Sequence, residues 1–219
     1  MKLYTFPDPA PNPRRVRLFC AEKDIEVESV MLDLMKGEHK SADLLARNSL
    51  GQLPVLTLDD GKTHIAETVS ICRYLEGLHP DKGPRLFGST PLEQAQVDMW
   101  IRRAEFQVGQ PIANFWRHAH PFTARVVEQH KAFGESNRAA LVKAVAWLDK
   151  EMSDGREWLA GAFFSMADIA AVTNIDFATY IGMAPLGDEG SGPQHVRAWH
   201  ARVNARPAFV AKPNVTPSL

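Results

Sequence analysis

The segment LPVLTLDDGKTHIAETVSICRYLE, residues 53–76, decides how the first part of this chain folds. The run LPVLTL begins at a proline, which a strand tolerates in its first position or at a sheet edge. The residues DDGK form a turn signal, and THIA then returns as the second strand of a hairpin. A helix over ETVSICRYLEGLHP follows and ends at Pro80. This segment therefore predicts two paired strands followed by a helix.

The residues before this hairpin predict a strand, a helix, a second strand and a short helix. KLYTF reads as the first strand, and Asn12 then stands as a helix N-cap with Pro13 as the first helical residue. The helix is expected to run to Lys23, with the second strand in IEVESVML and the short helix in GEHKSADLLARN. This order of elements predicts a small α/β domain over residues 1–80.

After residue 80 the pattern changes to helices alone. HPDKGPRLFGSTP is rich in proline and glycine and reads as a linker, placed at residues 81–90. TPLE and SMAD are capping boxes, with Thr90 and Ser165 as the caps, and the helix that TPLE opens is expected to run from Pro91 towards Trp116. QHVRAWHARVNARP is a last helix that closes before Pro207. The predicted fold class is thus α/β plus all-α, with a helical domain over residues 91–219 that covers the α/β domain.

Composition excludes several classes of function. Of the 219 residues 45% are hydrophobic, and 25 basic residues balance 26 acidic ones, so no basic face for nucleic acid is indicated. No signal-peptide core and no membrane-spanning run is expected. Cys20 and Cys72 show no zinc-ligand spacing, and we expect two buried free thiols in a reducing, cytoplasmic compartment, with no metal.

Three features of the first domain could bind a ligand. The proline-locked stretch FPDPAPNPRRVRLF leads into a helix N-terminus, which suits an anion. Leu53 precedes a proline that is a candidate for a cis bond, and its main-chain groups could pair with an extended peptide. Glu67 and Thr68 open a helix and could take the two charges of an α-amino acid end. Each feature also has a purely structural explanation, but together they indicate a site for a short charged peptide with a central thiol.

Four segments, PNPRRVRLFCAEK, LARNSLGQLPVL, AETVSICRYLE and FSMADIAA, resemble segments of the cytosolic glutathione transferases, in the same order along the chain. The resemblance covers nearly the whole chain. It implies a thioredoxin-like domain, a helical-bundle domain, glutathione as co-substrate and a homodimer. Because FWRHAHP is similar to the fungal Gtt-type subgroup, the chain is identified as a bacterial member that resembles this subgroup.

The resemblance also implies how glutathione would be held. Its cysteinyl backbone would pair with Leu53 before cis Pro54. Its γ-glutamyl end would bind Glu67 and Thr68. Its glycyl carboxylate would meet Lys40, with His39 as a further candidate.

One departure from the family pattern concerns catalysis. Many relatives carry a hydroxyl or thiol that faces the glutathione sulfur, whereas this chain has Ala10 at the position that resembles it. A donor near the sulfur lowers the pKa of the thiol by stabilising the thiolate. Three donors are candidates for this role: the free NH₂ of Asn12, the N–H groups at the helix start, and an ordered water positioned by His118 or His120. Of the residues named, we select Asn12 and His120 as the catalytic ones. The two histidines are expected on one helix at i and i+2, pointing to opposite sides, so that they cannot share a metal.

The same resemblance places a pocket for the second substrate near NFWRHAHPF. Phe115, Trp116 and Phe122 are expected to line it, and Tyr180 is the residue of the later core helix that could reach it.

The function expected is a glutathione S-transferase of a detoxifying kind, which conjugates glutathione to an apolar electrophile without a metal. Two alternatives remain at this point. One is a glutathione-dependent disulfide or peroxide reductase at the same site. The other is a non-catalytic binding protein, which Ala10 favours and the intact peptide site opposes.

Overall fold

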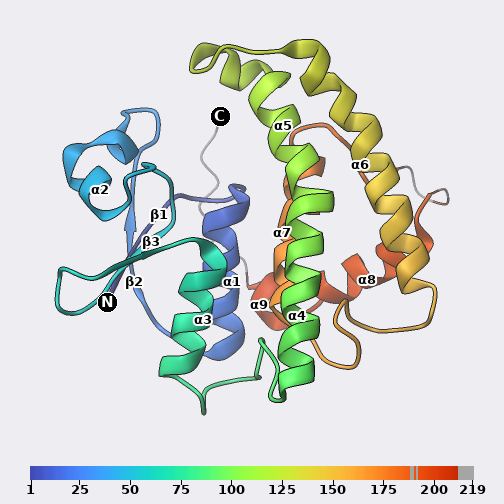
Figure 1. Ribbon diagram of the computed structural model, residues 1–219, viewed down its shortest axis with the longest axis horizontal. Coiled ribbons are helices and arrows are strands. Elements are labelled where there is room, and N and C mark those ends of the chain that lie inside the picture. The colour runs from blue at the N-terminus through green and yellow to red at the C-terminus, as the bar shows by residue number, and fades with distance from the viewer. Residues whose placement is uncertain (188–189, 191, 212–219) are drawn as a thin grey trace. The chain divides into compact units, whose positions relative to one another are not determined.

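The computed structural model describes residues 1–187, 190 and 192–211 (Figure 1). The chain forms two compact units. Unit 1 contains Met1–Leu86 together with the described residues from Pro207 on, and unit 2 contains Phe87–Arg206. Each unit has its own core and is described separately.

Unit 1 is built on a four-stranded mixed sheet. The strands are β1 (Lys2–Thr5), β2 (Glu28–Met31), β3 (Val55–Thr57) and β4 (His64–Ala66), in the order β2-β1-β3-β4. β1 runs parallel to β2, and β3 runs antiparallel to both β1 and β4. The predicted hairpin is therefore present, with Leu56 opposite Ile65.

The helices of unit 1 cover the sheet. They are α1 (Pro11–Lys23), the short 3₁₀ helix η1 (Glu38–Lys40), α2 (Ala42–Arg47), α3 (Thr68–Leu78) and α9 (Pro207–Val210). α1 and α3 lie side by side on one side of the sheet, and α2 lies on the other (Figure 1). Side chains such as Val16, Phe19 and Ile71 are fully buried there. The short α9, which the sequence analysis assigned to the helical domain, packs on α1, and its Phe209 is buried.

The prediction that Asn12 caps the first helix is wrong. α1 begins at Pro11, and Ala10 occupies the cap position without any side-chain hydrogen bond. Proline suits the first helical position because its fixed φ is already helical and its missing N–H would have no partner. Asn12 is thereby moved into the first turn, where its side chain is exposed.

Unit 2 is all-helical. Its elements are α4 (Pro91–Arg103), the π-helical segment η2 (Ala104–Gly109), α5 (Gln110–His118), the 3₁₀ helix η3 (Pro121–Arg125), α6 (Lys131–Met152), α7 (Met166–Tyr180) and α8 (Gln194–Asn204). The single helix predicted from Pro91 towards Trp116 is thus three consecutive segments, because a π-helical stretch interrupts the α-helix. An α/β unit followed by an all-helical unit is the predicted fold class.

α7 is the central helix of unit 2 and is buried along most of its length. The predicted capping box is confirmed, since Asp168 accepts hydrogen bonds from the main-chain N–H and the hydroxyl of Ser165. The same carboxylate also accepts from the N–H of Leu159 at 2.9 Å and from Trp199 Nε1 at 2.8 Å. Burial raises the pKa of Asp168, and the donated hydrogen bonds oppose this effect. The Thr90 capping box is confirmed as well, with Glu93 as its partner.

None of the described helices combines the length and the apolar composition that crossing a bilayer requires.

Candidate functional site

One edge of the unit 1 sheet gathers the starts of two helices. Because β3 is antiparallel to β1 and β4, the ends of β1 and β4 lie at the edge where β3 begins. α1 follows β1 and α3 follows β4, so both helix N-termini start at this edge. Val55 pairs with Ala66, and one further step in this register sets Pro54 opposite Glu67. We call this the sheet-edge site; it comprises Asn12, His39, Lys40, Leu53, Pro54, Glu67 and Thr68.

Leu53 offers main-chain hydrogen-bonding groups at this edge. The Leu53–Pro54 bond is cis, as the resemblance implies. Leu53 lies outside both strand ladders, and no turn or loop hydrogen bond described for the chain involves its N–H or C=O. An extended peptide could pair with these two groups as an added strand does.

Glu67 has an unusual backbone conformation at the start of α3. Its φ of 65° and ψ of 123° are rare for a residue with a side chain. Such a conformation costs about 1–3 kcal/mol and is found mostly at functional sites. The Glu67 side chain is exposed and makes no capping hydrogen bond, whereas Thr68 is buried. A carboxylate near the helix N-terminus and an amino group near Glu67 would both be stabilised here.

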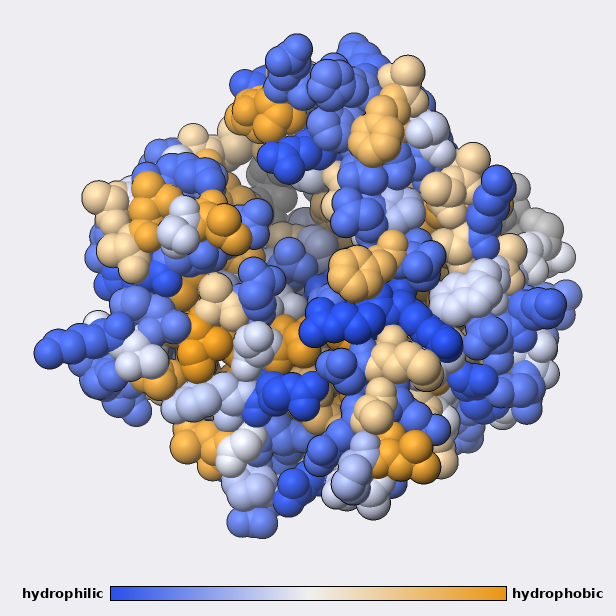
Figure 2. Space-filling view, in the orientation of Figure 1, coloured by the Kyte–Doolittle hydropathy of each residue, from blue (hydrophilic) through white to orange (hydrophobic). Residues whose placement is uncertain are grey.

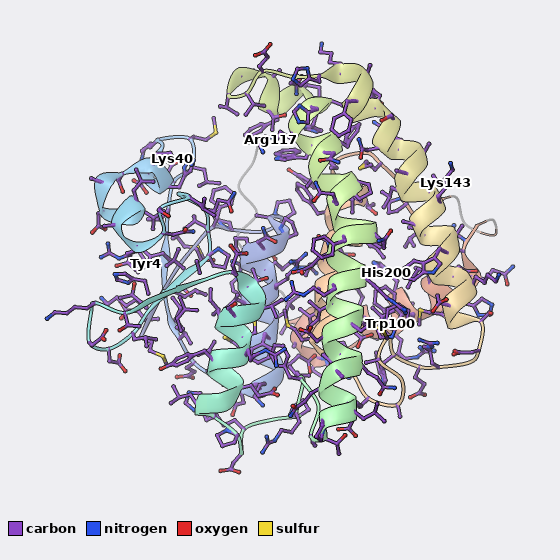
Figure 3. The ribbon with its side chains drawn as sticks, in the orientation of Figure 1. Tyr4, Lys40, Trp100, Arg117, Lys143 and His200 are labelled. Atoms are coloured by element: carbon purple, nitrogen blue, oxygen red, sulfur yellow. The ribbon has the colours of Figure 1, made fainter. Side chains whose placement is uncertain are left out.

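Lys40 is the cation of the sheet-edge site. Its Nζ donates to the main-chain oxygen of Leu50 at 3.1 Å, and its side chain is exposed beside the short α2 (Figure 3). The lysine runs close over Gly51, where a Cβ would stand 2.8 Å from Nζ. Burial, and then the charge of Lys40, lower the pKa of His39, so that this imidazole is neutral at pH 7. Lys40, rather than His39, is therefore the group of this pair that could offer a positive charge to a carboxylate.

Asn12 provides the free donors at the start of α1. Pro11 and Pro13 have no N–H, and the N–H of Arg14 already bonds to the oxygen of Ala10 at 3.2 Å. The expected group of several free N–H donors at this helix start is therefore absent from the described first turn. The Asn12 main-chain N–H and its side-chain NH₂ remain as donors.

Arg17 holds the proline-rich loop that leads to α1. Its guanidinium forms an ion pair with Asp8 and donates to Thr5 Oγ1 at 3.0 Å and to the Phe6 oxygen at 2.7 Å. A second cis bond, Asp8–Pro9, lies in this loop. This role of Arg17 was not predicted, since a single arginine on a helix gives no signal of the loop that it will hold.

The aromatic residues expected for the second substrate come together in unit 2. The Trp116 ring centroid lies 5.5 Å from that of Phe122 and 5.3 Å from that of Phe177. Tyr180 stacks on Phe177 at 6.3 Å and is 44% exposed, whereas Phe115 is buried. We call this cluster the aromatic site; it comprises Phe115, Trp116, His120, Phe122, Phe177 and Tyr180.

His120 is not on the helix where it was expected, so the argument from i and i+2 spacing is wrong. α5 ends at His118, and His120 lies in the following turn with its ring 4.5 Å from the Trp116 ring. Its Nδ1 accepts from the N–H of Phe122 at 3.3 Å, which leaves the proton of the neutral imidazole on Nε2. Burial lowers the pKa of His120, which favours this neutral form. His118 turns instead towards His130, 5.5 Å away.

Two residues that the sequence analysis missed hold the His120 turn. The Thr123 hydroxyl donates to the Trp116 oxygen at 2.6 Å, and Gln129 Nε2 donates to the His120 oxygen at 2.8 Å and to Thr123 Oγ1 at 3.0 Å. Neither residue belongs to a recognisable motif, because these contacts depend on how the chain turns between α5 and α6.

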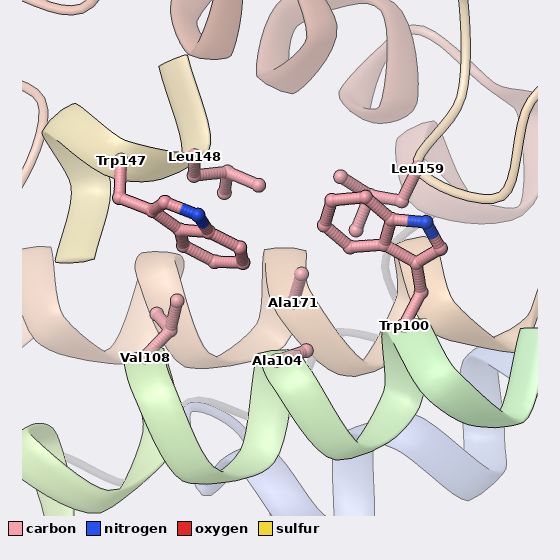
Figure 4. A pocket seen from close by; sticks show the side chains of 7 residues that line it. All are labelled: Trp100, Ala104, Val108, Trp147, Leu148, Leu159 and Ala171. Carbon is pink, nitrogen blue, oxygen red and sulfur yellow. The ribbon is translucent and has the colours of Figure 1, made fainter. Parts of the chain in front are cut away.

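A separate apolar pocket lies inside unit 2 (Figure 4). The Trp100 and Trp147 rings, 5.9 Å apart, form two of its walls, and the other lining side chains are aliphatic. It has no room for a water molecule and presents almost no polar group. We therefore regard it as a packing gap of the helical core.

The two cysteines do not provide a nucleophile. Both are buried free thiols, as the sequence predicts. Burial raises the pKa of Cys20 to about 12 and is also the main cause that raises the pKa of Cys72. Within the described part of the chain, no three His, Cys, Asp or Glu side chains are grouped to hold a metal ion.

Comparisons with known proteins agree with this arrangement. A family model for "Glutathione S-transferase, N-terminal domain" matches residues 10–78, and one for "Glutathione S-transferase, C-terminal domain" matches residues 109–207. The chain is 37% identical to glutathione S-transferase 2 of Saccharomyces cerevisiae over 212 residues, which cover 94% of this chain and 88% of the yeast protein.

Solved structures are similar over nearly the full length. A glutathione S-transferase domain-containing protein of Marinobacter aquaeolei VT8 superposes with a TM-score of 0.84 at 34% identity, covering 95% of this chain and all of that one. Gtt2 from Saccharomyces cerevisiae superposes with a TM-score of 0.83 at 33% identity, covering 96% of this chain and 99% of the yeast chain. Both similarities extend over the α/β unit and the helical unit.

Proposed function

The chain belongs to the glutathione S-transferase family, and we propose that it binds reduced glutathione at the sheet-edge site and conjugates it to an apolar electrophile held at the aromatic site. The observation that carries this proposal is the register of the β3–β4 hairpin. It brings the free main-chain groups of Leu53 next to the α3 N-terminus with Glu67 and Thr68. A peptide-binding strand edge and an amino-acid-binding helix start in one place fit a γ-glutamyl tripeptide.

Each part of glutathione has a chemical partner at the sheet-edge site. The cysteinyl N–H and C=O pair with the main chain of Leu53. The γ-glutamyl amino group binds the Glu67 carboxylate, and its carboxylate binds the first turn of α3 at Thr68. The glycyl carboxylate binds the ammonium of Lys40, with the neutral His39 beside it.

Thiolate stabilisation is assigned to Asn12 and His120. Asn12 donates to the sulfur from its NH₂ or its main-chain N–H, which lowers the pKa of the glutathione thiol in place of the hydroxyl that Ala10 lacks. The second role proposed is for His120, whose Nδ1 accepts from Phe122 so that Nε2 carries the proton, as the residue that would orient a water to donate to the sulfur. The thiolate then attacks the electrophilic carbon, a C–S bond forms and the leaving group departs with the bonding electrons. Holding both reactants in place supplies much of the rate enhancement.

The proposed biological unit is a homodimer in the cytoplasm. Leu92 and Met99 lie seven residues apart on α4 and are 68% and 41% exposed, and Phe106, a further seven residues along in η2, is 61% exposed. Over α4, hydrophobic side chains occur among hydrophilic ones on the face drawn in Figure 2. A second copy of the chain would bury these side chains. The two unpaired thiols are consistent with a reducing compartment.

The proposal is tested by titration calorimetry with glutathione and by conjugation of glutathione to a chlorinated aromatic acceptor. We expect saturable binding and acceptor-dependent thioether formation. Absence of heat on adding glutathione would refute the binding site. Binding together with turnover in a glutathione-disulfide-coupled assay, but none with the aromatic acceptor, would instead support a reductase.

A further inference from the structure

The loop between α2 and β3 is organised around the side chain of Asn48. Asn48 Oδ1 accepts from the N–H of Leu50 at 3.2 Å, and Asn48 Nδ2 donates to the oxygen of Gln52 at 2.9 Å. The main-chain oxygen of Asn48 also accepts from the N–H of Gly51 at 2.8 Å. One residue therefore bonds to each of the three residues of the loop that follow Ser49.

The bond to Gln52 has a direct consequence for Leu53. The C=O of Gln52 and the N–H of Leu53 belong to the same planar peptide group, in which they point in opposite directions. Asn48 Nδ2 holds the Gln52 oxygen towards the inside of the loop. The Leu53 N–H is consequently aimed away from the loop, and no other described hydrogen bond orients it. Donation to the carbonyl also polarises the peptide group, which strengthens its N–H as a donor.

A second hydrogen bond connects this loop to the side chain of Lys40. Lys40 Nζ donates to the oxygen of Leu50, so the Leu50 N–H and C=O are held by Asn48 and Lys40 respectively. Gly51, with a φ of 59°, allows the turn and leaves space for the lysine side chain. The loop therefore has a fixed shape before any ligand arrives.

We propose that Asn48 is a positioning residue for glutathione binding, which acts through the Gln52–Leu53 peptide group and does not touch the ligand. This inference rests on the proposed function, because it assumes that the Leu53 main chain pairs with the cysteinyl residue of glutathione. Preorganising this donor lowers the free-energy cost of ordering the loop when the ligand binds.

The test compares Asn48→Ala and Asn48→Asp with Ser49→Ala, in the same loop, as matched control. Asn48→Asp keeps the acceptor for the Leu50 N–H but has no donor for the Gln52 oxygen at neutral pH. Ser49→Ala removes an exposed side chain next to Asn48 and keeps all the hydrogen bonds that Asn48 makes to the loop. We expect both Asn48 variants to raise the Kd for glutathione about three- to tenfold, the range for losing one hydrogen bond, and the control to leave it unchanged.

Two further measurements separate positioning from a general structural role. The rate at saturating glutathione is expected to change by less than about twofold while KM rises, because the reacting atoms are untouched. Amide hydrogen exchange is expected to show glutathione-dependent protection of the Leu53 N–H in the parent and weaker protection in both Asn48 variants. Thermal unfolding of the unliganded proteins shows whether each variant is folded.

The outcomes distinguish this inference from the proposed function. If the parent gives no heat with glutathione, both are refuted. If the parent binds and folded Asn48 variants bind equally well, only the positioning role is refuted. Equal loss of affinity in Ser49→Ala would also refute it, since that variant keeps the Asn48–Gln52 bond.

Discussion

Glu67 is strained at the position where a role in binding glutathione is proposed. Its positive φ is a conformation that glycine adopts without strain and a side chain does not. In unit 1 the residue is exposed, so that burial of its side chain does not compensate for the strain. The conformation instead presents a carboxylate at the first turn of α3, where the proposed γ-glutamyl amino group would lie.

We predict that Glu67→Gln and Glu67→Gly weaken glutathione binding but differ in stability. Loss of a charge-assisted hydrogen bond should raise the Kd about tenfold in both variants. Glu67→Gly should also be about 1 kcal/mol more stable than the parent, because relief of strain exceeds the larger unfolded-state entropy of glycine. Calorimetry and urea unfolding measure the two effects. Glu26→Gln, at another exposed position, is the control, and equal binding by Glu67→Gln would argue against the assigned role.

His120 should make stability depend on pH. Its pKa in the folded protein is lowered from 6.5 by burial, so the unfolded chain binds more protons at mildly acidic pH. The contribution of His120 to stability is therefore complete above about pH 6.5 and is lost as the pH falls through the lower folded pKa. His39 has a pKa shift in the same direction, caused first by burial.

We predict that the free energy of unfolding of the parent decreases as the pH is lowered from 7 to 5. In the His120→Gln variant this decrease should be smaller. The measurement is urea unfolding at several pH values, with the exposed His195→Gln as control. An unchanged pH slope in His120→Gln would show that this imidazole is not the group that titrates.

At the scale of elements, the π-helical segment between α4 and α5 ends at a glycine with a tight contact. Gly109 lies against α7, and a Cβ added there would be 2.7 Å from Asn174 Nδ2 and 3.4 Å from Asn174 Cγ. Gly77 in α3 is also helical, but a Cβ there would meet nothing within 4 Å. A methyl group would therefore clash at Gly109, whereas it would fit without contact at Gly77.

We predict that alanine has opposite effects at these two positions. Gly109→Ala should destabilise unit 2 by about 1–3 kcal/mol because the added methyl group overpacks the contact with α7. Gly77→Ala should stabilise unit 1 by about 0.5–1 kcal/mol because it improves helix propensity without a clash. Thermal unfolding of the two variants beside the parent gives both values. If Gly109→Ala were instead stabilising, the Asn174 side chain on α7 would have to move away from the added methyl group at little cost in free energy.

At the scale of the whole molecule, the proposed dimer predicts the effect of charge on α4. Met99→Glu would place a carboxylate where a second chain is expected to bury an apolar side chain, so it should weaken association. The parent should sediment with twice the mass of the 24.4 kDa chain, and the variant should dissociate on dilution. Val142→Glu, at an exposed apolar position on α6, should leave the mass unchanged. A parent of single-chain mass would rule out the dimer.

The amino-acid sequence by itself determined the order of the elements from β1 to α3, the hairpin, the two capping boxes and the family. These features depend on local signals, such as the turn at DDGK and the Ser165–Asp168 spacing, and on the four motifs that resemble the glutathione transferases. The residues proposed to bind glutathione were also selected from the sequence, and their roles remain proposals to be tested.

Only the tertiary structure decided how the side chains at these positions are used. It showed that Asn12 is not a cap, because Pro11 begins α1. It placed His120 in a turn, where its Nδ1 accepts a hydrogen bond from the N–H of Phe122. It also showed that the side chain of Asn48 holds the peptide group between Gln52 and Leu53. These contacts depend on the orientation of a peptide plane or the course of a turn. Sequence spacing specifies where an element begins within a few residues, whereas such contacts are fixed only when the surrounding chain is packed in place.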